Sequence, residues 1–413
     1  MNRYETLKCG LIGKTLGHSY SPQIHAEFAD YEYRLYEMPE EEVGTFLKTA
    51  DYTALNVTIP YKKTVMPFLD EISDEALRIG SVNTITRTKN GGLRGDNTDY
   101  YGFSYMLDCA GIDVAGKKVL VIGNGGSSMT ARTVAEDRRA REVVIIGRAD
   151  NRPEVLATHA DCEVLFNTTP VGMYPNAGVS PVSLDFFPKL EGIVDVIYNP
   201  AITRLAHDAK ERGLKWITGL TMLVAQAKMA SELFTGGTID DAEIERVTEK
   251  VGSGMKNILL VGMPGCGKST IGGKLAELTG RPFVDTDALI VERAGVTIPE
   301  IFAAHGEAYF RRLETEVLAE VSQKSALIIA TGGGVVTRPE NHPLCTQNSI
   351  VAFLNRDVSI LPKDGRPISQ SRDLGELYRE RLPLYRAVCD FEIEVDTPDV
   401  TANARKILDK VGL

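Results

Sequence analysis

Residues 257–279, NILLV-GMPGCGKS-TIGGKLAELT, join an apolar run, a glycine-rich turn and a helical pattern. The turn at 262–269 matches G-x-x-x-x-G-K-[ST]. Between a strand and a helix, this pattern wraps backbone N–H groups and a helix N-terminus around phosphates. The stretch therefore predicts a strand–turn–helix unit that binds a nucleoside triphosphate.

Within that turn the residue types suggest separate roles. Lys268 has the length and charge to reach the β- and γ-phosphates, and the Ser269 hydroxyl is a typical Mg²⁺ ligand. Asp285 and Asp287 follow a short apolar run at 282–284, and two such carboxylates can divide labour between Mg²⁺ and an acceptor hydroxyl. We expect ATP to contact Gly262, Gly265, Gly267, Lys268, Ser269 and Thr270.

Two further strand-and-turn patterns lie upstream, at 7–17 and at 118–126. Short β-branched runs separated by helical stretches surround all three turns, and they predict strands at 143–146, 164–166, 193–197, 326–329 and 350–354. Strands alternating with helices indicate α/β domains with parallel sheets. The chain has 413 residues, which is more than one compact core holds, so we expect several domains.

The best domain boundary is the polar, Gly- and Ser-containing stretch at 249–256, which precedes a fresh apolar strand. The glycine-rich turn at 123–126 opens its own nucleotide-binding unit. We therefore expect a substrate domain at 1–104 completed by helices at about 219–240, a Rossmann-like domain at 105–218, a linker at 241–255 and a P-loop domain at 256–413.

Composition excludes several classes of protein. The net charge of −10 makes general binding to nucleic acid or to anionic membranes improbable on electrostatic grounds. No run approaches the roughly 18 apolar residues of a transmembrane helix. The six cysteines are scattered, without the spacing of a zinc site or a disulfide framework. We expect a cytoplasmic protein with free thiols and no obligatory protein partner.

The second turn, GNGGSS at 123–128, follows the apolar run KVLVI and precedes a helical pattern. Its spacing is that of a dinucleotide-binding turn with Ser in place of the third Gly. The next predicted strand ends in Gly147-Arg148, where an NAD site would have Asp or Glu. An Arg there suits a 2′-phosphate, so we predict NADP.

After residue 255 the chain resembles shikimate kinases. The motifs are GxxxxGKS, DTD, IF…GEAYFRRLE, GGG, GRP and RLPLY, in the order of that family. The resemblance implies that Asp285 acts with Ser269 near Mg²⁺ and that Asp287 binds the shikimate hydroxyls and serves as the base. It also implies that Arg366 stabilises the transferring phosphoryl group from a closing lid. The implied acceptor pocket consists of Asp287, Arg311, Gly332, Gly333, Gly334 and Arg381, with the two arginines on the carboxylate.

Residues 5–240 resemble shikimate dehydrogenases through GKTLGHSYSPQIH, NVTIPYK, SVNT, GDNTD, GNGGSS, NTTPVGM, DVIYNP and GLTMLVAQA. The resemblance implies that Lys62 and Asp99 form the catalytic pair. Implied substrate contacts are Ser19, Ser21, Asn56, Thr58, Asn83, Tyr198 and Gln226. Implied NADP contacts are Gly123, Gly125, Gly126, Ser127, Arg148, Asn167, Thr168, Gly219 and Met222. Gly147-Arg148-Ala149 replaces the family's Asn-Arg-Thr, which implies a milder NADP preference.

Together the resemblances imply a fusion that reduces 3-dehydroshikimate to shikimate with NADPH and then phosphorylates shikimate with ATP and Mg²⁺. The product, shikimate 3-phosphate, lies on the route to chorismate and the aromatic amino acids. Three alternatives remain open. They are a quinate/shikimate dehydrogenase that uses NAD, fused to a small-molecule kinase; a metabolite-sensing protein without turnover; and a kinase for another polyol acid such as gluconate.

Overall fold

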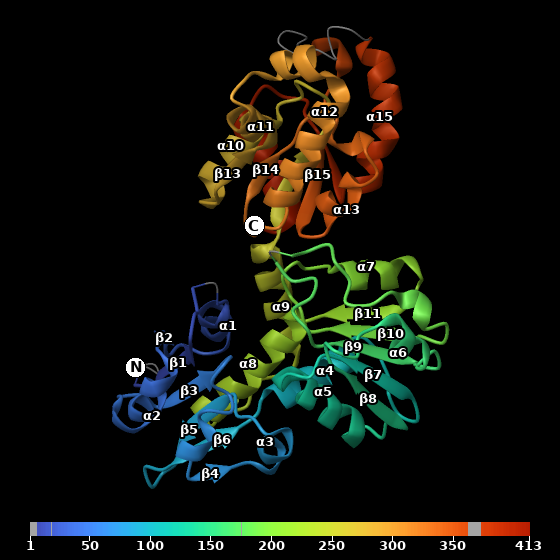
Figure 1. Cartoon of the computed structure of the whole chain (residues 1–413). Coiled ribbons are helices and arrows are strands. Elements are labelled where there is room, and N and C mark those ends of the chain that lie inside the picture. Colours follow the sequence, from blue (N-terminus) through green and yellow to red (C-terminus); the bar gives the residue numbers. More distant parts are fainter. Residues whose placement is uncertain (1–5, 18, 175, 362–372) are drawn as a thin grey trace. The chain divides into compact units, whose positions relative to one another are not determined.

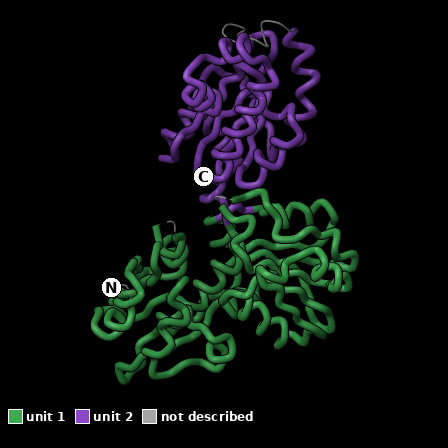
Figure 2. Tube along the Cα trace, viewed as in Figure 1, with its two compact units in different colours: residues 1–198, 202–251 green, residues 199–201, 252–413 purple. Residues whose placement is uncertain are grey.

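The computed structural model describes residues 6–17, 19–174, 176–361 and 373–413. The chain divides into two compact units, drawn in green and purple in Figure 2. Unit 1 consists of Met1–Tyr198 and Ile202–Val251, and unit 2 of Asn199–Ala201 and Gly252–Leu413. Sheets alternate with helices throughout both units, which confirms the predicted α/β class (Figure 1).

The first sheet of unit 1 contains β1 (Lys8–Gly13), β2 (Glu32–Glu37), β3 (Ala54–Val57), β4 (Glu71–Ile72), β5 (Thr84–Arg87) and β6 (Leu93–Asp96). Its order is β2-β1-β3-β5-β6-β4. β1 pairs in parallel with β2 and β3, whereas β5 is antiparallel to both of its neighbours. The carboxyl ends of β1 and β3 therefore meet at one edge. The accompanying helices are α1 (Ser21–Phe28), α2 (Glu40–Thr49) and α3 (Asp74–Ile79).

The second sheet contains β7 (Lys118–Ile122), β8 (Glu142–Ile146), β9 (Val164–Asn167), β10 (Gly192–Asp195) and β11 (Lys215–Thr218). All its pairs are parallel, in the order β11-β10-β9-β7-β8. Val119 and Val121 of β7 join one buried cluster, while Leu120 and Ile122 join another. This alternation is expected of a parallel strand that is covered on both faces.

Helices α4 (Asp99–Cys109), α5 (Gly126–Asp137), α6 (Pro153–Ala157), α7 (Arg204–Glu211) and α8 (Leu220–Thr235) complete unit 1 with part of α9. Helices α4 and α8 pack closely. A Cβ on Gly102 of α4 would lie 2.7 Å from the carbonyl oxygen of Met222 in α8. A glycine at this crossing lets the backbones approach, and it holds the N-terminal end of α4 beside the first turns of α8.

Unit 2 contains one parallel sheet, in the order β13-β14-β12-β15-β16. Its strands are β12 (Asn257–Val261), β13 (Phe283–Asp285), β14 (Ile328–Ala330), β15 (Ser349–Asn355) and β16 (Phe391–Glu394). Its helices are α10 (Lys268–Thr279), α11 (Thr286–Ala294), α12 (Ile298–Val321), α13 (Asn341–Thr346), α15 (Leu374–Val388) and α16 (Val400–Val411). Since all strands run the same way, the loops after β12, β13, β14 and β15 lie at one edge.

The segment 241–255, expected as a linker, is mostly a helix, α9 (Ala242–Met255). Its apolar residues Ile244, Val247, Val251 and Met255 are buried. They recur at helical spacing, so one face of the helix leaves solvent despite the Gly and Ser residues near its end. The helical spacing of these four apolar residues is hard to recognise in the sequence because the residues between them are mostly polar.

Two local features of unit 2 refine the predicted boundaries. The strand expected at 326–329 begins at Ile328, because Ala326 has a φ of 59°, outside the range of a strand. Gly306, with a φ of 77°, interrupts α12. A new helical run therefore begins just after Gly306.

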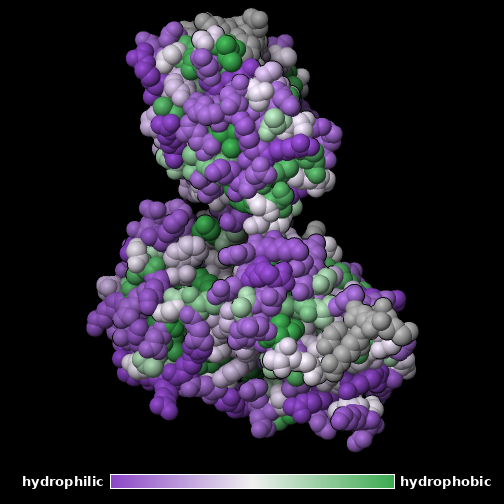
Figure 3. Space-filling view, turned by 180° about the vertical axis from the view of Figure 1, so that it is seen from behind, coloured by the Kyte–Doolittle hydropathy of each residue, from purple (hydrophilic) through white to green (hydrophobic). Residues whose placement is uncertain are grey.

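Hydrophilic residues predominate on the face drawn in Figure 3, and hydrophobic ones are scattered over it. Among the described residues, no helix is long and apolar enough to cross a bilayer. The same residues contain no group of three or more His, Cys, Asp or Glu side chains placed to hold a metal ion.

Candidate active sites

A cavity of about 450 Å³ lies in unit 1, at the carboxyl ends of β1 and β3 and beside the starts of α4, α5 and α8. All seven predicted substrate contacts line it: Ser19, Ser21, Asn56, Thr58, Asn83, Tyr198 and Gln226. The predicted catalytic pair lines it as well, with Ser127, Gly219 and Met222 from the predicted NADP set. Residues more than 200 positions apart in the sequence thus share one cavity.

Lys62 and Asp99 form an ion pair at the cavity wall. Lys62 Nζ donates to Asp99 Oδ2 at 2.6 Å, and the side chains are 21% and 12% exposed. Asp99 is the first residue of α4, where the partial positive charge of the helix end favours a carboxylate. The pair is therefore held in place, and its ammonium group still faces the cavity.

A network of buried amides and hydroxyls forms the floor of the cavity. Asn83 Oδ1 accepts from the backbone N–H of Thr98 at 2.7 Å, and Asn83 Nδ2 donates to Thr98 Oγ1 at 3.1 Å. Thr98 Oγ1 reaches Gln226 Oε1 at 3.4 Å. Asn56 joins the network through Thr84 Oγ1, at 3.2 Å. These contacts fix the polar side chains whose remaining hydrogen-bonding capacity faces the cavity.

The start of α1 and the residues before it contribute to the cavity wall. Ser21 is the first helical residue, and Tyr20 occupies the N-cap position without a side-chain capping bond. The Ser19 hydroxyl accepts from the backbone N–H of Ser21 at 3.2 Å. The Tyr20 ring also packs edge-on against Tyr198, with ring centroids 6.3 Å apart. The two serines and Tyr198 thus belong to one wall.

The dinucleotide turn lies at the carboxyl end of β7. Gly123 has a φ of 110°, and a Cβ there would meet Thr168 Oγ1 at 2.7 Å. Gly125 is the N-cap of α5 and Gly126 is the first residue of the helix. The turn and the helix N-terminus together present backbone N–H groups that suit a pyrophosphate. Gly219 is equally constrained, because a Cβ there would lie 2.0 Å from the carbonyl oxygen of Val196.

Six predicted NADP residues do not line the cavity: Gly123, Gly125, Gly126, Arg148, Asn167 and Thr168. The Asn167 side chain is fully buried, and its Nδ2 donates to Asp195 Oδ1 at 3.0 Å. Its Oδ1 accepts from the backbone and the hydroxyl of Thr169 at 3.0 and 2.7 Å. Thr168 Oγ1 donates to the carbonyl of Ile122 at 2.8 Å. Asn167 and Thr168 therefore organise the loop beside Gly123 with their side chains.

Asp195, the last residue of β10, is a residue that the sequence reasoning missed. It is fully buried and accepts from Asn167, from Thr203 Oγ1 at 2.8 Å and from the backbone N–H of Ile197 at 3.1 Å. Burial raises the pKa of its carboxyl to about 6. Its position at the end of a buried strand was the available signal.

Arg148 is exposed just beyond the carboxyl end of β8. A Cβ on Gly147 would lie 3.3 Å from Asn124 Nδ2 and 3.9 Å from Asp150 Oδ2. An arginine and a carboxylate therefore flank the same strand end. Arg148 suits the 2′-phosphate of NADP, whereas a carboxylate suits a ribose hydroxyl.

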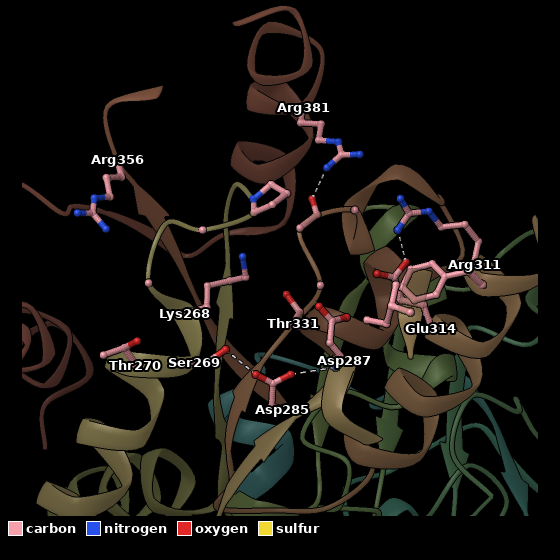
Figure 4. A pocket seen from close by; sticks show the side chains of 18 of the residues that line it. Lys268, Ser269, Thr270, Asp285, Asp287, Arg311, Glu314, Thr331, Arg356 and Arg381 are labelled. Atoms are coloured by element: carbon pink, nitrogen blue, oxygen red, sulfur yellow. Dashed lines mark hydrogen bonds and ion pairs between the residues drawn. The ribbon is translucent and has the colours of Figure 1, made fainter. Parts of the chain in front are cut away.

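A second cavity, of about 480 Å³, lies in unit 2 at the carboxyl edge of the sheet (Figure 4). The P-loop, the turn after β13, helix α12, the loop after β14 and helix α15 contribute to it. The predicted residues that line it are Gly265, Gly267, Lys268, Ser269, Thr270, Asp285, Asp287, Arg311, Gly332, Gly333, Gly334 and Arg381. Gly262 does not line it, and Arg366 lies outside the described residues.

The P-loop has the backbone conformation that its glycines allow. Gly262, Gly265 and Gly267 have φ values of 147°, 83° and 108°, which side chains rarely adopt. Lys268 Nζ donates to the carbonyl oxygens of Gly262 and Met263 at 2.9 and 3.0 Å. The loop therefore curls around its own ammonium group, at the start of α10.

Ser269 and Asp285 form a pair of oxygen donors beside the loop. Ser269 Oγ donates to Asp285 Oδ2 at 2.5 Å. The other carboxylate oxygen of Asp285 accepts from the backbone N–H of Asp287 at 3.0 Å and caps α11. A hydroxyl and a carboxylate fit Mg²⁺, which prefers oxygen ligands and keeps several waters.

Charged side chains of α12 and α15 face the opposite part of the cavity (Figure 4). Arg311 Nη1 donates to Glu314 Oε2 at 2.7 Å, and a Cβ on Gly334 would lie 2.2 Å from that nitrogen. The guanidinium thus rests on the bare backbone of Gly334. Arg381 Nη1 donates to the carbonyl of Gly333 at 3.0 Å. Two buried guanidinium groups beside one cavity can bind a carboxylate.

Asp287 and Glu314 face each other across Gly332. A Cβ on Gly332 would lie 2.8 Å from Asp287 Oδ1 and 2.6 Å from Glu314 Oε1. Both oxygens are buried and have no hydrogen-bond partner among the described residues. Burial, reinforced by the charge of Glu314, raises the pKa of Asp287 to about 6. The hydrogen-bonding capacity of these oxygens is unused within the described residues, and both side chains belong to residues that line the cavity.

Glu314 is the principal residue of this cavity that the sequence reasoning missed. A glutamate among arginines on a helix would be expected on a solvated face, yet Glu314 is fully buried. The available signal was its spacing of three residues from Arg311, which places both on one side of α12. The other lining residues without a predicted role are Pro264, Ile298, Phe302, Phe310, Thr331 and Arg356.

Comparison with known families gives two matches. A family model described as "Shikimate dehydrogenase substrate binding domain" matches residues 11–85. A model described as "Shikimate kinase" matches residues 264–412. The matched ranges contain the carboxyl ends of β1 and β3 and almost the whole of unit 2.

Among curated proteins, a shikimate dehydrogenase (NADP(+)) of Clostridium perfringens is 38% identical over 266 residues, which are 59% of this chain and 97% of the relative. The corresponding protein of Methanosphaera stadtmanae is 32% identical over 265 residues, covering 57% of this chain and 93% of the relative.

Solved structures agree with these relatives. A chorismate mutase/shikimate 5-dehydrogenase fusion protein of Clostridium acetobutylicum has a TM-score of 0.56 at 34% identity, covering 60% of this chain and 97% of that chain. A shikimate 5-dehydrogenase of Thermus thermophilus, in complex with NADP(H) and shikimate, has a TM-score of 0.54 at 31% identity, covering 59% and 99%. This chain therefore belongs to the shikimate dehydrogenase family and carries a shikimate kinase domain after it, as a bifunctional enzyme of aromatic amino-acid biosynthesis.

Proposed function

We propose that unit 1 reduces 3-dehydroshikimate to shikimate with NADPH and that unit 2 phosphorylates shikimate to shikimate 3-phosphate with ATP and Mg²⁺. The observation that supports this most is that Lys62 and Asp99 line one cavity and that Lys268 and Asp287 line a second cavity of similar size. We also propose a cytoplasmic location, with small molecules as the partners.

In the dehydrogenase, NADPH supplies a hydride to the ring ketone, and negative charge develops on the carbonyl oxygen. Lys62 Nζ is placed to stabilise that oxygen and to deliver a proton to it. Asp99, at 2.6 Å, orients the ammonium and balances its charge. The amides of Asn56, Asn83 and Gln226 and the hydroxyls of Ser19, Ser21, Thr58 and Tyr198 bind the ring substituents. Acid–base assistance of this kind contributes about 10²–10⁴-fold to turnover.

The NADP residues fall into two groups under this proposal. Ser127, Gly219 and Met222 contact the nicotinamide end, since they line the cavity beside the catalytic pair. Gly123, Gly125 and Gly126 bind the pyrophosphate through backbone N–H groups, and Arg148 binds the 2′-phosphate. Asn167 and Thr168 act by shaping the loop beside Gly123 through buried hydrogen bonds.

In the kinase, Arg311 and Arg381 bind the shikimate carboxylate beside the backbone of Gly332–Gly334. Asp287 accepts a hydrogen bond from the acceptor hydroxyl and takes up its proton. Lys268 and the P-loop hold the phosphates, and Ser269 and Asp285 ligate Mg²⁺. Arg366 contributes positive charge to the transferring phosphoryl group. Phosphoryl transfer depends mainly on such positioning and charge stabilisation.

The position of Asp150 supports a further proposal about the cofactor, namely that the dehydrogenase also accepts NAD. Its carboxylate approaches the strand end where a ribose 2′-hydroxyl would lie, and Arg148 provides the competing positive charge. Steady-state rates with both cofactors, each with shikimate and with quinate as substrate, test this point. A kcat/KM for NADP that is higher by more than about 10³-fold would contradict it.

A one-pot assay tests the whole proposal. Purified protein is incubated with 3-dehydroshikimate, NADPH, ATP and Mg²⁺, and shikimate 3-phosphate is identified by mass spectrometry. When ATP is omitted, we expect NADPH to be oxidised and shikimate to accumulate. When Mg²⁺ is chelated, we expect phosphorylation to be lost. Protein that binds both nucleotides but converts neither substrate would instead favour the sensing alternative.

A further inference from the structure

Behind the substrate face of the dehydrogenase cavity lies Tyr33, which does not line the cavity. It belongs to the edge strand β2, and its hydroxyl donates to Asn56 Oδ1 at 2.8 Å. Asn56 lines the cavity and is 5% exposed. We propose that Tyr33 is a positioning residue that fixes which end of the Asn56 amide is presented to the substrate. The inference rests on the proposed function of this cavity.

The hydrogen bonds around Asn56 allow one orientation of its amide. Asn56 Nδ2 donates to Thr84 Oγ1 at 3.2 Å and to the carbonyl oxygen of Asn83 at 3.4 Å. A carbonyl oxygen can only accept, so the NH₂ group must face it. The Oδ1 end then faces Tyr33 and requires a donor, which the phenolic O–H supplies.

The two ends of the amide are held with unequal strength. The bond into Oδ1 is 2.8 Å long, whereas both bonds from Nδ2 are at or beyond the usual upper limit for N–H···O. Oδ1 is therefore the anchored end, and the NH₂ group is the end that can turn toward a ligand oxygen. Tyr33 thereby presents Asn56 as a hydrogen-bond donor to the substrate.

Tyr33 is itself held by an aromatic cluster. Its ring stacks on the fully buried His25 at 4.2 Å, with the planes 18° apart. His25 Nδ1 lies 2.6 Å from Tyr31 Oη, which lies 2.7 Å from Ser231 Oγ of α8. Burial raises the pKa of the Tyr33 hydroxyl well above its ordinary value, while a hydrogen bond with Ser21 opposes that rise. The hydroxyl therefore keeps its proton and remains a donor.

The surroundings of Tyr33 show that its hydroxyl has a specific use. The flanking residues Glu32 and Arg34 are exposed, as is expected on an edge strand. Packing against His25 requires a flat ring but no oxygen. Loss of the oxygen would remove the 2.8 Å hydrogen bond into Asn56 Oδ1, and leaving a buried hydrogen bond unmade is costly.

Tyr33→Phe tests the proposal, with Tyr31→Phe as the matched control. Each variant removes one buried hydroxyl from the same cluster, but only Tyr33 touches Asn56. In the oxidation of shikimate by NADP⁺, we expect Tyr33→Phe to raise the KM for shikimate about tenfold and to change kcat less than about threefold. Tyr31→Phe should leave both values near wild type. The Kd for NADP⁺, followed by fluorescence, should not change in either variant.

Kinase activity and the thermal unfolding midpoint of each variant provide folding controls on the same chain. A second measurement combines Tyr33→Phe with Asn56→Ala. If Tyr33 acts through Asn56, the double variant should have the KM of Asn56→Ala alone. If the two substitutions instead raise the KM for shikimate independently, so that their fold-changes multiply in the double variant, the proposal is overturned. This holds even if Tyr33→Phe lowers the stability of the protein. An unchanged KM in Tyr33→Phe, or an equal rise in Tyr31→Phe, would also overturn it. Absence of shikimate oxidation in the wild type would refute the proposed function instead.

Discussion

The dehydrogenase cavity and the kinase cavity have similar volumes, about 450 and 480 Å³, but they hold their polar groups differently. The polar groups of the first are mainly amides and hydroxyls around the Lys62–Asp99 ion pair. The second places Lys268, Arg311 and Arg381 against Asp285, Asp287 and Glu314. Both are proposed to bind the same ring acid.

The contrast follows from the chemistry assigned to each cavity. Hydride transfer develops charge on one oxygen, so one well-placed proton donor suffices and neutral groups can bind the rest of the ring. Phosphoryl transfer spreads negative charge over several oxygens, so positive groups must surround them. Under the proposed function, unit 1 would bind the ring acid mainly through neutral amides and hydroxyls, whereas unit 2 would bind its carboxylate through Arg311 and Arg381.

Removing the ammonium of Lys62 should produce the largest separation between the two activities. Lys62→Ala is expected to lower the kcat of the dehydrogenase about 10³-fold, because the developing oxyanion loses its proton donor. Kinase activity should stay near wild type, and it is measured on the same sample. The exposed neighbour provides the control, since Lys63→Ala should leave both activities unchanged. Equal loss of both activities would show that Lys62 is structural.

Glu314→Gln sharpens the kinase side of the contrast. Glu314 Oε2 balances the charge of the buried Arg311, and Gln keeps the shape but removes the charge. We expect the KM for shikimate to rise about 30-fold, since breaking a buried charge pair is costly even when one hydrogen bond remains. Glu316→Gln, on the exposed side of the same helix, is the matched control. Arg311 Nη2 also donates to Glu307 Oε1 at 3.1 Å, so a KM unchanged in both variants would mean that Glu307 alone orients Arg311.

The pH dependence of the kinase should depend on Asp287. Its pKa is raised to about 6, chiefly by burial, so the carboxyl gains a proton as the pH falls through that value. If the ionised form accepts the hydroxyl proton, kcat/KM for shikimate should be level above about pH 7 and fall about tenfold per unit below about pH 6. A profile that stays level down to about pH 5 would argue against Asp287 as the base.

Arg148→Ala is expected to have the smallest effect, because the side chain is exposed. The KM for NADP⁺ should rise about fivefold, while the KM for NAD⁺ should not change. Arg141→Ala is the control, since Arg141 precedes β8 whereas Arg148 follows it. A similar rise with both cofactors would place Arg148 away from the 2′-phosphate.

Much of the fold could be predicted because its signals are local. The glycines at 262–267 and 123–126 stand between apolar strands and helices, and each turn lies at the carboxyl end of an interior parallel strand. Buried parallel strands such as 118–122 and 257–261 are also apolar at every position after the first, Lys118 and Asn257. Turns and strands of this kind are determined by residues close together in the sequence, so they can be predicted without knowledge of the tertiary structure.

The parts that escaped prediction depend on contacts that a linear sequence does not display. Asn167 sits in a polar motif, yet its side chain turns inward to Asp195, 28 residues away. Glu314 looks like a surface charge until Gly332 and Asp287 are brought beside it. The burial of α9 was hidden because its spaced apolar residues lie among Glu, Lys, Gly and Ser. In these three cases the polar or charged residues predicted a solvent-exposed segment, but tertiary packing buries it.

The boundary between the two units falls within a single helix, α9, of one polypeptide. Every ribosome that completes this chain therefore delivers one hydride-transfer centre and one phosphotransfer centre, in a fixed ratio. Gene dosage and degradation change both capacities together. Under the proposed function, the steady-state pool of shikimate depends on the ratio of two turnover numbers and two Michaelis constants, and a substitution in one cavity would alter that pool at any expression level.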